Sequence, residues 1–278
     1  MARGSRAYQS IFSILRPAVG PSSSHTLGPL LCARDFRARI ERALRRGAAA
    51  SLRIELYGSL AATGKGHRTD LALIAGLSGE RPEEDGSALA PESVARVQAA
   101  GGIAVKGTLV RFDPERDIRW IRKLPAWSAH PNTLRFVLAA GRAKVAAAYV
   151  SLGAGLFTPL GRKPAAPRPA QPIPYPYRTM HDLLALSEAT GYPISHLVLA
   201  DETAFAGQSA ATVLERLDSL WRLMKATIER GLAAEGELPG GLGVMRRAKQ
   251  IWEESRRRVS HPEAILSLPA WTIERLRA

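Results

Sequence analysis

Two polar stretches near the start of the chain combine residue types that bind an acidic group and move a proton. The first, Gly20-Pro21-Ser22-Ser23-Ser24-His25-Thr26, precedes an apolar pattern of helical spacing. Free N–H groups and the helix dipole at a helix N-terminus favour an anion such as a carboxylate. We therefore predict a carboxylate-binding segment made of Ser22, Ser23, Ser24, His25 and Thr26. The alternative is a plain serine-rich helix cap, because Ser and Thr are common at such positions.

The second stretch, Gly64-Lys65-Gly66-His67-Arg68-Thr69-Asp70, comes after a strand pattern that ends near Gly58. It is not a nucleotide-binding P-loop, because five residues rather than four separate Gly58 from Gly64. An imidazole whose pKa lies near the working pH is a good proton acceptor. We predict that His67 is a catalytic base and that Lys65 contacts the substrate. The alternative is an ordinary polar surface histidine, which is the commoner role of a lone histidine in a loop.

Two later segments could complete such a site. His130-Pro131-Asn132 places an imidazole and an amide in a turn that proline restricts, and we predict that His130 and Asn132 contact the substrate. Ser151-Leu152-Gly153-Ala154-Gly155 ends a strand pattern in glycines, where a backbone can approach a bound group. Plain turn and strand-exit chemistry explain both segments equally well. His25, His67 and His130 lie roughly forty residues apart or more and lack metal-ligand spacing, so we predict no metal ligands.

Composition limits the classes of protein to which the chain can belong. Its 278 residues are 46% hydrophobic and 23% charged, which is typical of globular proteins. No apolar run reaches the roughly 20 residues that span a bilayer, so we expect a cytoplasmic protein without a membrane partner. The single cysteine cannot form an intrachain disulfide. The net charge of +14 raises nucleic-acid binding as an alternative, but 6% aromatic residues and dispersed arginines argue against it.

The hydrophobic periodicity predicts an α+β protein in two parts. We expect an α/β sandwich domain with a mostly antiparallel sheet over residues 1–158, a proline-rich linker over 159–176, and an incomplete all-helical domain over 177–278. Thr26 is expected to cap the first helix. Strands are predicted at 52–56, 103–112, 134–139 and 145–152, and helices at 33–44, 69–77, 179–189, 209–230 and 245–258.

The order of these segments resembles the iron–sulfur-dependent L-serine dehydratases, also called L-serine ammonia-lyases. The four segments described above match that family's N-terminal beta domain. Beyond the linker the resemblance continues through Pro174-Tyr175-Pro176-Tyr177, Gly236-Glu237-Leu238-Pro239-Gly240-Gly241 and Arg246-Arg247-Ala248, the start of its helical alpha domain.

The resemblance implies deamination of L-serine to pyruvate and ammonia. In this family a [4Fe–4S] cluster acts as Lewis acid toward the leaving hydroxyl and a base removes the α-proton. His67 is the base that the resemblance implies, and Ser22, Ser23, Ser24, His25, Thr26, His130 and Asn132 would line the site.

The chain departs from the family at three places. Arg68 stands where a small residue or a second histidine is usual, and Ala154 replaces a usual glycine. The family's cluster cysteines lie beyond the last residue, whereas a cluster takes about three or four thiolates and this chain has Cys32 alone. We therefore expect a truncated or split member that is catalytic only with a separate cysteine-bearing subunit. A homo-oligomer is a further expectation, and the alternative function is a non-catalytic regulatory or amino-acid-binding remnant.

Overall fold

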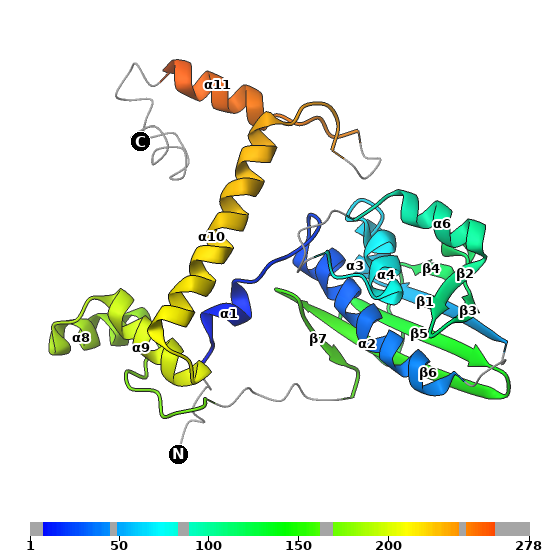
Figure 1. Cartoon of the computed structure of the whole chain (residues 1–278), viewed down its shortest axis with the longest axis horizontal. Coiled ribbons are helices and arrows are strands. Elements are labelled where there is room, and N and C mark those ends of the chain that lie inside the picture. Colours follow the sequence, from blue (N-terminus) through cyan, green and yellow to red (C-terminus); the bar gives the residue numbers. More distant parts are fainter. Residues whose placement is uncertain (1–7, 45–48, 83–88, 162–168, 239–242, 259–278) are drawn as a thin grey trace. The chain divides into compact units, whose positions relative to one another are not determined.

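The computed structural model describes residues 8–44, 49–82, 89–161, 169–238 and 243–258. The chain divides into two compact units, Met1–Glu215 and Arg216–Ala278. The first unit contains a seven-stranded sheet with helices against it (Figure 1). The predicted division at 158 and 176 stays a prediction, and the predicted linker lies partly outside the described residues, as does 259–278.

The sheet is mixed but mostly antiparallel, as predicted. Its order is β2-β3-β1-β5-β6-β7, and β4 also pairs with β1. β1 is parallel to β3 and β4, and every other pairing is antiparallel. The strands are β1 (Ala50–Tyr57), β2 (Gly102–Val105), β3 (Thr108–Arg111), β4 (Ile118–Ile121), β5 (Thr133–Ala140), β6 (Ala143–Gly153) and β7 (Leu156–Pro159).

Helices α2 (Gly28–Ala43) and α4 (Thr69–Ser78) lie together across one face of the sheet (Figure 1). α2 buries the apolar residues that recur at helical spacing, and Phe36 stacks on Phe136 of β5 with ring centroids 4.8 Å apart. α4 is apolar on all sides and buried along most of its length, which is expected of a helix inside a core. Shorter helices complete this unit: α1 (Ile11–Ile14), the π-helix η1 (Ser23–Leu27), α3 (Ser59–Thr63), α6 (Glu92–Ala100) and α7 (Pro114–Asp117).

β1 shows why one face of the sheet is covered and the other is not. Leu52, Ile54 and Leu56 are buried toward the helices, while Arg53 between them is exposed. This alternation with a period of two was predicted, and it is confirmed. The opposite face of β1 therefore carries polar side chains.

Two local predictions were wrong. The segment 103–112 is a hairpin of β2 and β3 rather than one strand, because Lys106 and Gly107 both have positive φ and reverse the chain in a tight turn. Thr26 does not cap α2. Ser22 caps η1 instead, since its hydroxyl accepts a hydrogen bond from the His25 N–H, and η1 continues directly into α2.

Among the described residues, four helices follow the sheet: α8 (Met180–Thr190), α9 (Ile194–Ala206), α10 (Ala210–Ala233) and α11 (Ala248–Arg258). Thr179 and Asp182 form a reciprocal capping box at the start of α8. α9 was not predicted, and its buried Glu202 accepts hydrogen bonds from the Tyr8 and Ser10 hydroxyls. None of the helices in the described ranges combines the length and hydropathy of a membrane span.

Candidate functional site

The antiparallel pairing of three strands brings distant segments to one end of the sheet. β1 runs toward Gly58, β5 starts after Asn132, and β6 runs toward Ser151 and Gly153. In antiparallel neighbours, the end of one strand lies beside the start of the next. The second, third and fourth predicted segments therefore meet at this end of the sheet.

Hydrogen bonds hold these strand ends together. The Ser59 N–H donates to the Pro131 carbonyl at 2.8 Å. The Asn132 side-chain amide donates to the Ser151 carbonyl at 3.3 Å, and the Ser151 hydroxyl donates to the Ser24 carbonyl at 2.7 Å. The last of these bonds joins the first predicted segment to the strand ends.

Gly58 is required where β1 ends. Its φ is +59°, a conformation that side chains with a Cβ rarely adopt. A Cβ there would also lie 2.6 Å from the Pro131 carbonyl oxygen. This close approach lets Ser59 turn into α3 directly beside the His130-Pro131-Asn132 turn.

His25 lies between two serine hydroxyls. Its Nδ1 is 2.9 Å from Ser24 Oγ, and its Nε2 is 3.0 Å from Ser59 Oγ. Only 9% of the residue is exposed. Burial, and then the neighbouring His67, lower the pKa of His25 below its ordinary value, although an interaction with the Ser59 backbone opposes this. These effects favour the neutral ring, which can donate to one hydroxyl and accept from the other.

His67 is held in one tautomer by its own loop. Its Nδ1 lies 2.9 Å from the Thr63 carbonyl oxygen, which can only accept a hydrogen bond, so Nδ1 carries the proton. Nε2 of the neutral ring is then the basic nitrogen. The His67 and His25 ring centroids are 4.9 Å apart, so the two predicted segments place their imidazoles side by side.

Two threonines join these segments through their backbones. The Thr26 hydroxyl donates to the His67 carbonyl at 2.7 Å, and the Thr69 hydroxyl donates to the His25 carbonyl at 2.6 Å. Both threonines are fully buried. Thr26 therefore positions the His67 loop rather than presenting its hydroxyl to solvent.

Three other predicted residues have contacts outside the histidine pair. The Lys65 ammonium lies over the Trp120 ring, 5.9 Å from its centroid. His130 Nδ1 accepts the Asn132 N–H at 3.1 Å within their own turn. Ser23 Oγ accepts the Ala154 N–H at 3.1 Å. Their predicted contacts with a substrate stay predictions.

Ser59, Thr69 and Ser151 were not among the predicted site residues, although Thr69 and Ser151 lie in candidate segments and all three hydrogen-bond to His25 or Ser24. We call Ser24, His25, Ser59 and His67 the histidine–serine cluster. The available signal for Ser59 and Ser151 was their position at the ends of predicted strands. That signal becomes specific only once the strand pairing is known.

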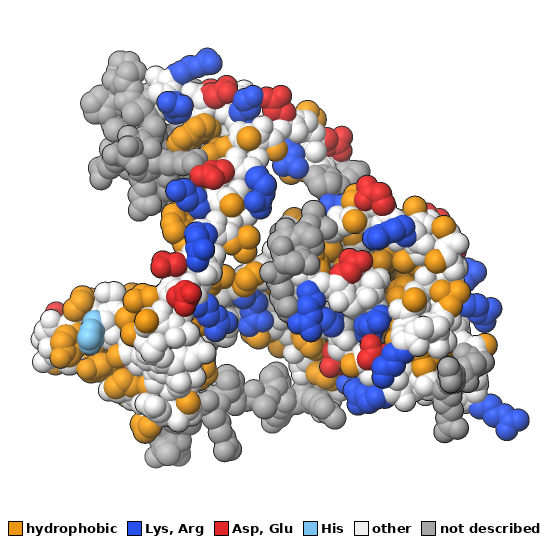
Figure 2. Space-filling view, viewed as in Figure 1, with side chains coloured by type: hydrophobic (Ala, Val, Ile, Leu, Met, Phe, Trp, Pro, Cys, Tyr) orange, Lys and Arg blue, Asp and Glu red, His pale blue; other side chains and the backbone are white. Residues whose placement is uncertain are grey.

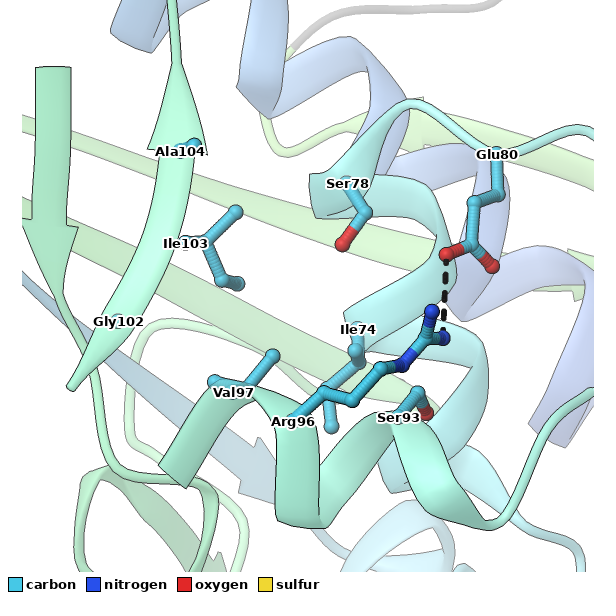
Figure 3. Close-up of a pocket in the computed structure, with 9 residues that line it drawn as sticks. All are labelled: Ile74, Ser78, Glu80, Ser93, Arg96, Val97, Gly102, Ile103 and Ala104. Atoms are coloured by element: carbon cyan, nitrogen blue, oxygen red, sulfur yellow. Dashed lines mark ion pairs between the residues drawn. The ribbon is translucent and has the colours of Figure 1, made fainter. Parts of the chain in front are cut away.

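A cavity elsewhere in the first unit contains none of the predicted site residues. It measures about 260 Å³ and lies among α4, α6 and β2 (Figure 3). Glu80 and Arg96 form an ion pair of 3.9 Å across it. Its opposite charges compensate each other, and its other lining side chains are small or apolar.

The donor set of this chain does not fit an iron–sulfur cluster. Cys32, its single cysteine, is fully buried in α2, and burial raises the pKa of its thiol well above the ordinary value. Over the ranges that the structure describes, no group of three or more His, Cys, Asp or Glu side chains could hold a metal ion. A cluster needs several thiolates, which one cysteine cannot supply.

The fold and the cluster define an α+β protein with two adjacent histidines at one end of its sheet. The family described as the serine dehydratase beta chain matches residues 10–160. L-serine dehydratase of Streptomyces coelicolor is 36% identical over 244 residues, covering 86% of this chain and 53% of that protein. L-serine dehydratase 2 of Escherichia coli is 33% identical over 249 residues, covering 87% and 53%. The chain thus spans about half the length of the curated relatives that it matches, and it belongs to the serine dehydratase beta-chain family.

Proposed function

We propose that the chain is the beta-domain part of an enzyme that deaminates L-serine to pyruvate and ammonia, and that the histidine–serine cluster contacts the amino acid. The observation that carries this proposal is the His25–His67 pair, in which His25 is buried between two serine hydroxyls and the Nδ1 of His67 is fixed by the Thr63 carbonyl, in a chain of this family. The relatives' names supply the substrate, L-serine.

The hydroxyls of the first segment are suited to the substrate carboxylate. Ser22 already receives hydrogen bonds from the N–H groups of His25, Thr26 and Leu27 through its side chain and carbonyl. Backbone donors of η1 are thus largely occupied. The Ser22 and Ser24 hydroxyls lie 3.4 Å apart and are half-buried, so both can turn a proton toward an acidic group.

His67 is suited to remove the α-proton. Its Nδ1–H is held by Thr63, which leaves Nε2 to accept a proton. The protonated His67 ring would carry a positive charge. A neutral His25 beside it would not repel that charge. Thr26 holds the carbonyl of the same residue, so the loop is braced on both sides.

We propose that the [4Fe–4S] cluster of the reaction is held by cysteines that lie outside residues 1–278. The single buried Cys32 supports this assignment, and no step is assigned to the cluster on this chain. The same observation favours the second candidate function, a non-catalytic amino-acid-binding protein.

Calorimetric titration of the full chain tests the substrate assignment. L-Serine should bind saturably, and a Ser24→Ala variant should bind about tenfold more weakly through loss of a charge-assisted hydrogen bond. Ser219→Ala, a substitution on exposed α10, serves as the control and should bind as wild type does. Equal affinity of wild type and Ser24→Ala would contradict the assigned carboxylate contact. Binding without turnover in the presence of a cysteine-bearing half would favour the second candidate.

A further inference from the structure

Four arginines line a second pocket, at a place where the sheet divides. β1 pairs with β3 through Ala50 and Ser51 and with β4 through Ile54–Tyr57. Between these two ladders, at Leu52 and Arg53, β1 pairs with neither β3 nor β4. A pocket of about 320 Å³ lies at this division, and its arginines are Arg53, Arg111, Arg116 and Arg119.

Strand register places three of these arginines on the open face. Ser51 pairs with Arg111 in β3, and Glu55 pairs with Arg119 in β4. Paired residues of neighbouring strands lie on the same face, and alternate residues of β1 share that face with Arg53. Val137 of β5, which pairs with Arg53 and is only 7% exposed, forms an apolar part of the lining.

The acidic groups near this pocket are already engaged. Asp117, its one acidic lining residue, accepts hydrogen bonds from the Arg116 side chain and from the Asp113 N–H. Glu55 forms ion pairs with Arg53 and Arg135. In the part of the chain that the structure describes, the side chains of Arg111 and Arg119 form no hydrogen bond or ion pair, although Arg119 helps to lower the pKa of Asp117. Two exposed guanidinium groups therefore face the pocket without an acidic partner in contact.

We propose that this pocket binds a small anion with two or more negative charges, carried by phosphate or carboxylate groups. Guanidinium groups match the geometry of these anions because they present paired N–H donors. The volume of the pocket falls within the range of small-molecule sites. The cavity of Figure 3 is not a comparable anion site, because Glu80 forms an ion pair with its one arginine, Arg96.

The pocket is separate from the histidine–serine cluster. From Arg53 to Gly58 the strand advances about 16 Å, at about 3.3 Å per residue. The two sites share no residue. The anion is therefore a ligand other than the amino acid, and L-serine, which has no net charge, should not compete with it.

Calorimetry of the full chain in 0.15 M chloride tests the proposal, because this salt screens isolated surface charges. Inorganic phosphate and citrate are the two probes, and at least one should bind saturably. The double variant Arg111→Gln/Arg119→Gln should bind that probe at least about tenfold more weakly. The matched control Arg122→Gln/Arg142→Gln removes the same charge from exposed positions outside the pocket and should bind as wild type does.

Each outcome decides the question. Phosphate bound more tightly than citrate would identify a phosphate ligand, and the reverse would identify a polycarboxylate. The proposal is overturned if neither probe binds to the wild type, or if the two double variants weaken binding equally. Equal weakening would mean that the anions respond only to the net charge of +14. Far-ultraviolet circular dichroism should show that both variants are folded, since all four arginines are exposed.

Discussion

The two histidines of the cluster are held in different ways. His25 is buried between hydroxyls, and His67 is tied to a backbone carbonyl of its own loop. A buried ring between hydroxyls resists protonation, whereas a ring that is fixed through Nδ1 leaves Nε2 available to accept a proton. We therefore infer that His25 positions its neighbours and that His67 accepts the proton, which agrees with the different roles predicted for the two residues from the sequence.

The lowered pKa of His25 predicts a pH dependence of stability. The unfolded chain takes up a proton near pH 6.5, but the folded chain does so only at lower pH. The unfolded state therefore binds more protons in this window, and the free energy of unfolding should fall as the pH drops from about 6.5 through the folded pKa. Urea titrations between pH 7.5 and 5.5 measure this slope.

His25→Asn should reduce the slope, whereas His181→Gln on the exposed surface of α8 should keep it. An unchanged slope in His25→Asn would show that another group is responsible.

The backbone conformation of Ala154 predicts that its substitution by glycine stabilises the protein. Its φ is +49°, which costs an L-residue with a Cβ about 1 kcal/mol or more. Ala154→Gly should therefore raise the free energy of unfolding by about 0.5–1 kcal/mol, measured by urea denaturation. Ala146→Gly, in the regular part of β6, should lower it. A loss of stability in Ala154→Gly would mean that its methyl group makes contacts worth more than the strain.

At the element scale, the core depends on the close approach of α2 and α4. Gly76 of α4 faces Leu30 of α2, and a Cβ there would lie 2.3 Å from the Leu30 carbonyl oxygen. These helices also carry or adjoin the two histidine segments, since η1 continues into α2 and His67 precedes α4. Their separation therefore sets the geometry of the histidine pair.

Gly76→Ala should destabilise the first unit by about 1–3 kcal/mol, because the clash is with backbone rather than with a flexible side chain. Gly231→Ala in α10 is the matched control, since nothing lies within 4 Å of its added Cβ. That substitution should stabilise its helix by up to about 1 kcal/mol. Thermal unfolding followed by circular dichroism compares the two, and a neutral Gly76→Ala would show that the helices can move apart freely.

Elements with strong local patterns were predictable from the sequence. β1 and α4 follow their hydrophobic periods, and Gly79 ends α4 as expected, with φ of +84°. The turn at Lys106 was missed because lysine is an uncommon residue at positive φ. The contacts of Ser59 and Ser151 depend on strand pairing between distant residues, which no local pattern specifies.

At the scale of the whole molecule, positive charge and a single thiol are the prominent features. Within the visible part of each unit, Figure 2 shows Lys and Arg side chains interspersed with other side chains rather than gathered into one stripe. This distribution is consistent with local anion sites more than with a continuous track for a nucleic-acid backbone.

The single buried Cys32 predicts that the purified chain holds no [4Fe–4S] cluster. Anaerobic reconstitution with iron and sulfide, followed by gel filtration, should leave no cluster absorbance near 400 nm with the protein. A stable cluster would overturn this prediction and would place ligands where none is foreseen. Cys32→Ser is the control, and it should give the same spectrum as wild type.

The most direct test of the proposed function is pyruvate formation from L-serine by a reconstituted pair. The full chain would be mixed anaerobically with the remaining half of the Streptomyces coelicolor relative, the part that this chain does not cover, and the co-eluting complex assayed. We predict pyruvate from the complex, none from either part alone, and a loss of at least about a hundredfold with His67→Gln. A His67→Gln complex as active as wild type would contradict the central role assigned to His67.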